Sequence, residues 1–359
     1  MRGYLLKELL SMMITLLFVG SLLTSLGWYM VDTNNVQPRQ LPPLKKSPTK
    51  LPEPCKNCDE TVKKAFELYS EPWKKQEDNY NQFRSQLNTK CNALENAIIT
   101  QANTPKGTKI LFDGDKKTNM AVNEEIFGTL IKENPFPNKT WSSCAVVGNG
   151  GILANSSCGR TIDAAQFVIR CNLPPLSNGL EKDVGNKTDM VTANPSIIIE
   201  KYFSLMQRRR PFAEALRSYG NALVLLPAFS FRHNTALSLR AFYTIDDFRG
   251  SARAVYFNPK YLRNLATFWR SKGLKSPRLS TGIMMASIAL EMCSEVHLYG
   301  FWPFEIHPYS SQTLMNHYYD DRKAKNKFHA MPTEFNLLLK LHREGVLRLH
   351  LGECHPDEK

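Results

Sequence analysis

"CAVVGNGGIL", residues 144–153, is a short apolar run that breaks into three glycines and an asparagine. An apolar strand that ends in glycines usually brings backbone close to another group, because glycine has no side chain to hold that group away. The dinucleotide fingerprint G-x-G-x-x-G fails because Leu153 stands at its third glycine, and the Lys-Ser/Thr of a P-loop is missing. A nucleotide site and a plain tight turn both stay open, with Asn149 able to donate and accept hydrogen bonds there.

Outward from this stretch, short β-rich runs alternate with amphipathic segments from residue 143 onward. Strands are predicted for CAVVG, QFVIRCN, DMVTAN, ALVLLPA, AVYFNP and EVHLYGF, and helices for residues 197–220, 260–273 and 281–293. Apolar strands that alternate with helices are typical of a parallel sheet covered on both faces. The predicted fold class is therefore α/β, with a mostly parallel central sheet in one catalytic domain.

Several polar and glycine-containing segments fall at the carboxyl ends of these predicted strands. They are residues 148–150, Asn172, Asn194 and residues 300–302. Ligands of open α/β sheets bind at that edge, so one site is expected there.

The N-terminal segment predicts a membrane anchor. Residues 9–31 carry no charge, and these 23 residues at about 1.5 Å each make roughly 34 Å of helix, enough to cross a bilayer. A cleaved signal peptide is the alternative, but the run is long for one and no clear A-x-A site follows it. Arg2 and Lys7 precede the run, which predicts a cytoplasmic tail at residues 1–8 and a luminal remainder.

The luminal part divides into a stem and a catalytic domain. Residues 32–54 are rich in proline and lysine, which is typical of an extended stem, and helical patterning follows between residues 59 and 101. The stem is predicted at residues 32–70 and the catalytic domain at residues 71–359. Luminal exposure agrees with eight cysteines, which favour disulfides, and with N-glycosylation sequons at Asn138, Asn155 and Asn186.

The net charge of +13 favours an anionic substrate or an anionic membrane surface. In a soluble nuclear protein such a charge would suggest nucleic acid as the partner, but a membrane anchor argues against it. A generically basic protein of the secretory pathway is the alternative, and charge alone does not decide.

Two further stretches carry candidate site residues. Ser280, Thr281 and Gly282 open a predicted helix, which is either an ordinary N-cap or an anion-binding helix N-terminus. His317 and His329 lie in HYYDDRKAKNKFHAMPTE, where their spacing matches neither H-E-x-x-H nor a zinc finger. A neutral histidine is instead a natural general base near neutral pH.

FDGDKK, residues 112–117, holds a D-x-D pair at Asp113 and Asp115. Such a pair can hold a divalent cation, but this one reads more readily as a surface turn.

Four of these stretches, in order, resemble the large, small, third and very-small sialylmotifs of animal sialyltransferases. They are residues 144–175, RLSTGIMMASIALEMCSEVHLYGFWPF, HYYD and HAMPTE. The sequence is most similar to the α2,8-sialyltransferases, and PWKKQEDNYNQFRSQL and LLPAFSFRHNT resemble the type VI enzymes, with type V next. The resemblance covers about residues 70–354.

The resemblance implies a Rossmann-like, GT-A-variant glycosyltransferase domain in a single-pass type II protein of the Golgi membrane. It implies inverting transfer of sialic acid from CMP-sialic acid, without metal or other cofactor, to the 8-hydroxyl of a terminal sialic acid on a glycoprotein or glycolipid. His329 is implied as the catalytic base, with Glu334 supporting its loop. The implied donor-binding residues are Asn149, Asn172, Ser280, Thr281, Gly282, Trp302 and His317.

The cysteines follow the same resemblance. It implies the disulfides Cys144–Cys293 and Cys158–Cys354, although four cysteines alone would allow three pairings. Cys171, inside a predicted strand, is expected as a buried free thiol. The pairing of the other cysteines, Cys55, Cys58 and Cys91, stays open, as does a homodimer.

A membrane lectin that binds sialylated glycans without turnover is the alternative function. The presence of both His317 and His329 argues against it, since binding alone needs no base. Polysialic acid synthesis is a further alternative, because relatives that build chains carry a dense basic tract before the small motif. Residues 249–278 hold eight Lys and Arg, but apolar residues interrupt them, so mono- or short oligosialylation is expected.

Overall fold

The computed structural model describes residues 12–24, 58–115, 117–136, 140–276, 278–309, 312–322 and 331–354. The chain divides into two units between Pro52 and Glu53. In the first unit, residues 12–24 form a helix with exposed side chains. They belong to the anchor expected at residues 9–31, whose other residues lie outside the described ones. No helix in the described ranges is both long enough and apolar enough for a membrane crossing.

The second unit is built on an eight-stranded sheet in the order β1-β8-β7-β6-β5-β4-β9-β10. Strands β4 to β10 pair in parallel with one another, whereas the two-residue β1 pairs antiparallel with β8. The bounds are β1 (Ile98–Ile99), β4 (Trp141–Val147), β5 (Phe167–Arg170), β6 (Met190–Thr192), β7 (Leu223–Leu226), β8 (Arg253–Phe257), β9 (Cys293–Tyr299) and β10 (Arg348–His350). The predicted α/β class with a mostly parallel sheet is confirmed, and the six predicted strands are β4 to β9.

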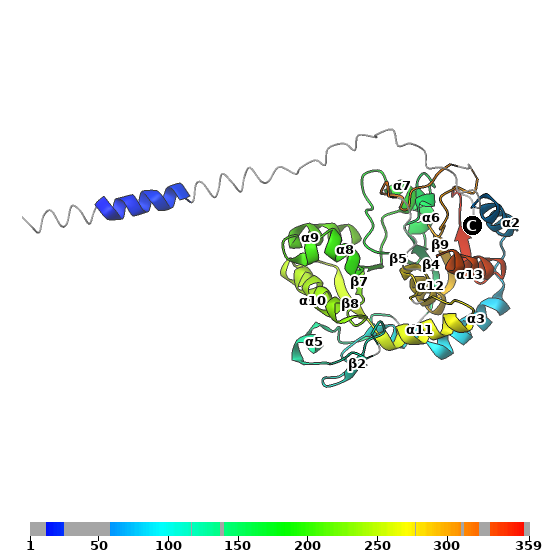
Figure 1. Ribbon diagram of the computed structural model, residues 1–359, viewed down its shortest axis with the longest axis horizontal. Coiled ribbons are helices and arrows are strands. Elements are labelled where there is room, and N and C mark those ends of the chain that lie inside the picture. The colour runs from blue at the N-terminus through cyan, green and yellow to red at the C-terminus, as the bar shows by residue number, and fades with distance from the viewer. Residues whose placement is uncertain are drawn as a thin grey trace, which may run out of the picture. The chain divides into compact units, whose positions relative to one another are not determined.

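Helices cover both faces of this sheet. In β4, Cys144 and Val146 point into one apolar core, and Ala145 and Val147 point into the other. The first core contains residues of α2 (Cys58–Tyr69), α3 (Glu77–Lys90), α4 (Ala93–Asn96), α11 (Pro259–Ser271), α12 (Thr281–Met292) and α13 (Met331–Arg343). The second contains residues of α5 (Glu124–Thr129), α6 (Gly159–Asp163), α7 (Glu181–Val184), α8 (Pro195–Glu200), α9 (Arg209–Leu216) and α10 (Arg232–Asp247). Figure 1 shows α8, α9 and α10 grouped beside β7 and β8, while α11 runs alongside α3.

The strand order reverses next to β4. From β4 the chain adds β5, β6, β7 and β8 on one side, and then returns to place β9 on the other side. Such a reversal leaves a crevice at the carboxyl ends of the strands, where ligands bind in open α/β folds. The loops after β4, β5, β6 and β9 meet at this edge.

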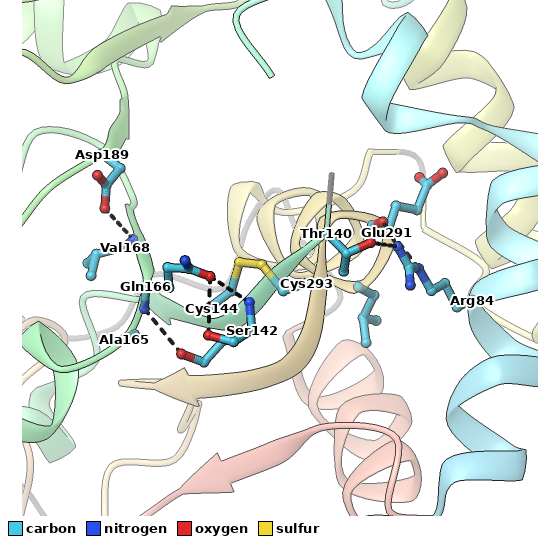
Figure 2. The surroundings of a disulfide bond; sticks show 12 residues. Arg84, Thr140, Ser142, Cys144, Ala165, Gln166, Val168, Asp189, Glu291 and Cys293 are labelled. Atoms are coloured by element: carbon cyan, nitrogen blue, oxygen red, sulfur yellow. Dashed lines mark hydrogen bonds between the residues drawn. A yellow bond between two sulfur atoms is a disulfide. The ribbon is translucent and has the colours of Figure 1, made fainter. Parts of the chain in front are cut away.

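Two disulfides fasten distant parts of the chain to β4 and the turn that follows it. Cys144–Cys293 joins β4 to the start of β9, and Figure 2 shows it beside the hydrogen bond from Ser142 N to Gln166 Oε1. Cys158–Cys354 joins the turn before α6 to the segment after β10. Both pairs agree with those implied by the resemblance. They close loops of 149 and 196 residues, each worth about 5 kcal/mol in the chain-entropy model.

Cys171 is a buried free thiol, as predicted, and burial raises its pKa to about 12. Cys91 is also free and buried, at the end of α3 in the first core. Its pKa is raised to about 12, first by burial and then by the charge of Glu291. Cys55 and the side chain of Cys58 lie outside the described residues.

The single helix predicted over residues 197–220 is wrong. The chain breaks there into α8, the 3₁₀ turn η2 (Phe203–Leu205), α9 and the 3₁₀ turn η3 (Arg217–Tyr219). The three residues of η2 have positive φ values of 50°, 53° and 57°. This left-handed stretch lets Tyr202 and Leu205 both reach the core, each only 2% exposed. A helical apolar period does not reveal such a reversal.

Side chains from α2, α13 and the segment after α2 form hydrogen bonds with the backbone in and around the edge strand β10. The backbone N–H of Leu349 donates to His342 Nδ1 at 3.1 Å, and that of Leu351 donates to Tyr69 Oη at 3.3 Å. Trp73 Nε1 donates to the Leu347 carbonyl at 2.9 Å. Residues 58–69, expected in the stem, therefore form α2 and pack against the folded unit.

Candidate active site

The glycines after β4 make room for backbone rather than for a ligand. A Cβ atom on Gly148 would lie 2.9 Å from the Gly300 carbonyl oxygen, and one on Gly150 would lie 2.5 Å from it. Gly148 N and Gly150 N donate to the carbonyls of Tyr299 and Gly300 at 2.7 and 3.1 Å. The loops after β4 and β9 thus touch through their main chains.

Asn149 is the polar side chain of this turn. Its Nδ2 donates to the Cys171 carbonyl at 2.8 Å, and its backbone carbonyl accepts from Tyr318 N at 3.0 Å. Its Oδ1 is buried and has no hydrogen-bond partner among the described residues. A buried acceptor without a partner costs about 1–3 kcal/mol, so this oxygen marks a place where a ligand donor would be favourable.

Asn172 follows β5 in the left-handed region, with φ of 62°. Asparagine tolerates this conformation better than most residues because its side chain is short and polar. Its Oδ1 accepts from Asn194 N at 3.0 Å, and its own N–H donates to Thr192 Oγ1 at 2.8 Å. The ends of β5 and β6 are therefore joined through Asn172.

Asn194 connects these strand ends to the start of α12. Its Nδ2 donates to Thr281 Oγ1 at 3.1 Å.

Ser280 is the N-cap of α12, and its Oγ accepts from Ile283 N at 3.2 Å. Gly282 packs under Phe301, because a Cβ there would lie 2.8 Å from the ring. The N-cap alternative for Ser280 is therefore confirmed, and anion binding at this helix N-terminus stays a prediction.

Glu334 holds the same turn from α13. It is 2% exposed, and its Oε1 accepts from Ser280 N at 2.9 Å. Glu334 thus supports the turn before α12, and its expected support of the His329 loop stays a prediction. His329, the expected catalytic base, lies outside the described residues.

His317 lies beside the glycine turn, because its backbone forms an antiparallel bridge with Gly150. Its Nδ1 is 2.7 Å from Asp320 Oδ2, and its ring stacks on Tyr319 with centroids 5.1 Å apart. The carboxylate assigns the ring proton to Nδ1, which leaves Nε2 as the acceptor. Asn316 Nδ2 lies 3.2 Å from that nitrogen. Asp320 therefore fixes both the tautomer and the orientation of the ring.

Two tyrosines hold the loop after Asn172 in place. Tyr318 Oη donates to the Pro175 carbonyl at 2.8 Å, and Tyr219 Oη donates to the carbonyl of Pro174. Burial raises the pKa of both phenols, so they stay protonated donors. Because Tyr318 N also donates to the Asn149 carbonyl, Tyr318 joins the His317 segment to both asparagine loops.

Trp302 is 6% exposed and serves its own loop. Its Nε1 donates to the Ile306 carbonyl at 2.8 Å, and its ring packs edge-on against Phe335 of α13 at 5.3 Å. The indole N–H is therefore already used within the protein.

The remaining sequence candidates lie elsewhere or are undescribed. Asn155 and Asn186 are exposed, whereas Asn138 lies outside the described residues. Asp113 accepts from Ser230 Oγ at 2.8 Å, while Asp115 bonds within its own turn to Lys117 N. Within the described ranges no group of three or more His, Cys, Asp and Glu side chains could hold a metal ion.

The sequence did not predict the structural roles of three residues of this site. Asn194 was noted only as a strand end, and Tyr318 and Asp320 only as letters of HYYD. The spacing of Asp320, three residues after His317, was a usable signal for a carboxylate that orients the imidazole. The contact between Asn194 and Thr281 spans 87 residues and leaves no local trace in the sequence.

A model of glycosyltransferase family 29 (sialyltransferase) matches residues 98–346. Over 288 residues the chain is 44% identical to alpha-2,8-sialyltransferase 8F of Homo sapiens, covering 80% of this chain and 72% of that protein. It is 48% identical over 274 residues to alpha-2,8-sialyltransferase 8E of Homo sapiens, covering 76% and 73%. It is 42% identical over 285 residues to alpha-N-acetylneuraminide alpha-2,8-sialyltransferase of Xenopus tropicalis, covering 79% and 82%.

Among solved structures, the chain is similar to a mammalian sialyltransferase in complex with Gal-beta-1-3GalNAc-ortho-nitrophenol. The TM-score is 0.41 and the sequence identity is 21%, over 82% of this chain and 86% of that chain.

Proposed function

The chain belongs to glycosyltransferase family 29, the sialyltransferases, and on that premise we propose that it is an α2,8-sialyltransferase. It would transfer sialic acid from CMP-sialic acid to the 8-hydroxyl of a terminal sialic acid on a glycoprotein or glycolipid. The names of the relatives at 42–48% identity support the linkage. The observation that carries the donor site is the buried Oδ1 of Asn149, which has no hydrogen-bond partner within the described part of the chain and follows the strand next to which the strand order reverses.

The donor-binding role is divided among groups of different polarity. Asn149 Oδ1 is an acceptor, so it suits a hydroxyl or amino group of the nucleoside rather than a phosphate oxygen. Thr281 lies at the first turn of α12, whose N–H groups and dipole favour an anion such as the donor carboxylate. Asn172 and Asn194 fix the distance between these two ends of the site through their shared hydrogen bond.

The reaction needs one bond broken and one bond made. The bond between the anomeric carbon of sialic acid and the phosphate oxygen of CMP breaks, and its electron pair leaves with CMP. The 8-oxygen of the acceptor attacks the opposite face of that carbon, so the configuration inverts. His329 takes the proton of the attacking hydroxyl. Fixed donors around the phosphate stabilise the leaving charge without a metal. His317, whose Nδ1 is bonded to Asp320, donates there from Nε2 when both ring nitrogens carry a proton.

The cellular setting belongs to the same proposal. We place a retained anchor at residues 9–31 in the Golgi membrane, a cytoplasmic tail before it, and the stem and GT-A-variant domain in the lumen. Mono- or short oligosialylation of glycans fits better than long chains, and nucleic acid is not a partner. The charge-free N-terminal run and the exposed Asn155 and Asn186 support the luminal placement.

A panel of acceptors tests the function. The full-length chain, solubilised in detergent, is incubated with CMP-sialic acid and glycans that end in sialic acid or in galactose, and products are analysed for linkage and chain length. We expect α2,8-linked products on the sialylated acceptors only. Binding of sialylated glycans without product from any acceptor would favour a lectin instead.

Two substitutions separate chemistry from donor binding. His329→Ala should lower kcat by about 10²- to 10⁴-fold while CMP affinity changes little. Asn149→Ala should instead weaken CMP binding by about ten-fold, because it removes the hydrogen bonds that the amide makes. Titration of each variant with CMP, followed by kinetics, distinguishes the two outcomes. Full turnover in His329→Ala would remove this histidine from its proposed role.

A further inference from the structure

Three segments outside the donor-binding turns meet next to them. They are the turn of the hairpin formed by β2 (Lys109–Leu111) and β3 (Asn119–Ala121), the loop after β7, and the segment before α12. Gly114 N donates to the Ser230 carbonyl at 3.0 Å, and a Cβ on Gly114 would lie 2.4 Å from the Phe231 ring. The guanidinium carbon of Arg278 lies 5.2 Å above the centroid of that ring. Phe231 is thus held between the hairpin turn and Arg278.

The position of this cluster relates it to the proposed donor site. The loop that carries Phe231 follows the carboxyl end of β7, and β7 is the neighbour of β6, whose end carries Asn194. Arg278 comes two residues before Ser280. The cluster therefore lies at the same edge of the sheet, on the side of the donor-binding residues that faces away from β4.

The exposed part of the cluster is aromatic and cationic. Arg278, Arg232 and His233 are exposed, and the His233 ring stacks on Phe231 with centroids 5.9 Å apart and planes 13° apart. The carboxylate nearby, Asp113, is turned inward and bonded by Ser230 Oγ at 2.8 Å. Burial raises the pKa of Asp113, with Ser230, Arg278 and Arg263 acting in the opposite direction. The other carboxylate of the hairpin turn, Asp115, accepts from Lys117 N at 3.1 Å and interacts with the charge of Arg232. The cluster therefore presents the Arg278 guanidinium next to an aromatic ring.

We propose that Arg278, held over Phe231, receives the carboxylate of the terminal sialic acid on the acceptor. The inference rests on the proposed function, because it assigns the acceptor half of that site. A planar guanidinium binds a carboxylate through two parallel hydrogen bonds, which gives both affinity and orientation. The Phe231 ring limits the freedom of Arg278 and offers an apolar surface beside it. A glycan that ends in galactose has no carboxylate there, so this contact would select sialylated acceptors.

Arg278→Gln tests the contact, with Arg270→Gln as the matched control on the exposed side of α11. Both variants lose one exposed charge from the same stretch of chain. For a sialylated oligosaccharide, Arg278→Gln should raise the acceptor KM about 10- to 100-fold, the range expected for a hydrogen bond to a charged group. The KM for CMP-sialic acid should stay unchanged, and Arg270→Gln should match the wild type. Arg278→Lys should recover part of the loss, since it keeps the charge but not the planar fork.

An acceptor whose carboxyl group is reduced to an alcohol makes the test specific to charge. The wild type should bind this acceptor more weakly than the native one, and Arg278→Gln should cause no further loss. Three results would overturn the proposal: Arg278→Gln raises the KM equally for the native and the reduced acceptor, it changes the KM for CMP-sialic acid, or it changes neither KM.

Binding separates this proposal from the proposed function. Titration of the sialylated oligosaccharide into the protein with CMP present measures acceptor affinity without turnover. Weaker binding to Arg278→Gln would support the contact even in a protein that makes no product, in which case the transferase function alone fails. If the wild type transfers sialic acid normally and Arg278→Gln binds the oligosaccharide as well as the wild type does, only the assignment of Arg278 is wrong.

Discussion

Asn149 and its glycine neighbours have different tasks, which the sequence could only partly separate. The quoted run predicted that backbone would approach something closely, and it singled out Asn149 as the polar side chain. The group that approaches is the Gly300 loop, about 150 residues further along the chain. Local sequence cannot name a partner that tertiary folding supplies. The residues in the sialylmotifs were found by resemblance, whereas the contact of Asn194 with Thr281, 87 residues further along, arises only when the chain folds.

Glu291 predicts a pH-dependent stability. It is 1% exposed, and its pKa is raised to about 7, chiefly by burial, with Ala93 N and Tyr261 Oη bonded to its carboxylate. A carboxyl whose pKa is higher in the folded than in the unfolded chain holds its proton more tightly when folded, so stability falls as pH rises. Between the ordinary value of 4.5 and about 7, we expect a loss on the order of 2–3 kcal/mol.

Glu291→Gln removes this titration. Its free energy of unfolding should be lower than or similar to that of the wild type at pH 5, and should fall less as pH rises to 8. Denaturant unfolding at pH 5, 6, 7 and 8 measures the difference. Glu67→Gln, on the exposed side of α2, is the control and should parallel the wild type. Parallel profiles for Glu291→Gln and the wild type would contradict the expectation.

Among the elements, the continuous apolar strands were predictable and the irregular ones were not. β4 to β9 follow from runs such as ALVLLPA, whose residues are buried on both faces. β10 was missed because three residues are too few to establish the polar/apolar alternation that indicates a strand. The helix over residues 197–220 failed because apolar spacing carries no information on the positive φ values at Phe203–Leu205.

The contact of Asn194, two residues after β6, with Thr281 of α12 predicts an energetic coupling. Asn194→Ala and Thr281→Val each remove one partner of the 3.1 Å hydrogen bond. Each should raise the KM for CMP-sialic acid, because the bond sets the position of the α12 turn relative to Asn172. The double variant should lose less than the sum of the two, with a coupling energy of about 0.5–1.5 kcal/mol.

Thr89→Val supplies the control for this cycle. Thr89 is an exposed residue of α3 whose hydroxyl bonds within its own helix. Its effect should add to that of Asn194→Ala, as expected for sites without a shared partner. Strict additivity for Asn194 and Thr281 as well would show that their hydrogen bond does not act on donor binding.

At the scale of the whole molecule, α2 belongs to the folded unit, although the sequence predicted these residues as part of the stem that precedes it. Val62 and Ala65 of α2 are buried in the first core, and Tyr69 bonds the free edge of β10. A chain that begins at residue 72 should therefore be less stable than one that begins at residue 53, by at least about 2 kcal/mol from lost apolar burial. Thermal unfolding of the two chains, followed by CMP binding, measures this.

Tyr69→Phe in the longer chain isolates one part of the effect. It removes only the hydroxyl that accepts from Leu351 N, so we expect a loss of about 1 kcal/mol. Equal stability of the two chain lengths would mean that α2 adds nothing to the unit.

The two disulfides set an order of events during synthesis. Cys144 and Cys158 leave the ribosome 149 and 196 residues before Cys293 and Cys354, their partners. Any bond that the nascent chain forms at Cys144 before residue 293 is made must be a wrong one, and Cys171 is already present as a competitor. The burial of Cys171 on folding withdraws it from exchange. Correct pairing of Cys144 therefore has to wait until residue 293 has been made, and that of Cys158 until residue 354, so each disulfide closes only after the strands between its two cysteines exist.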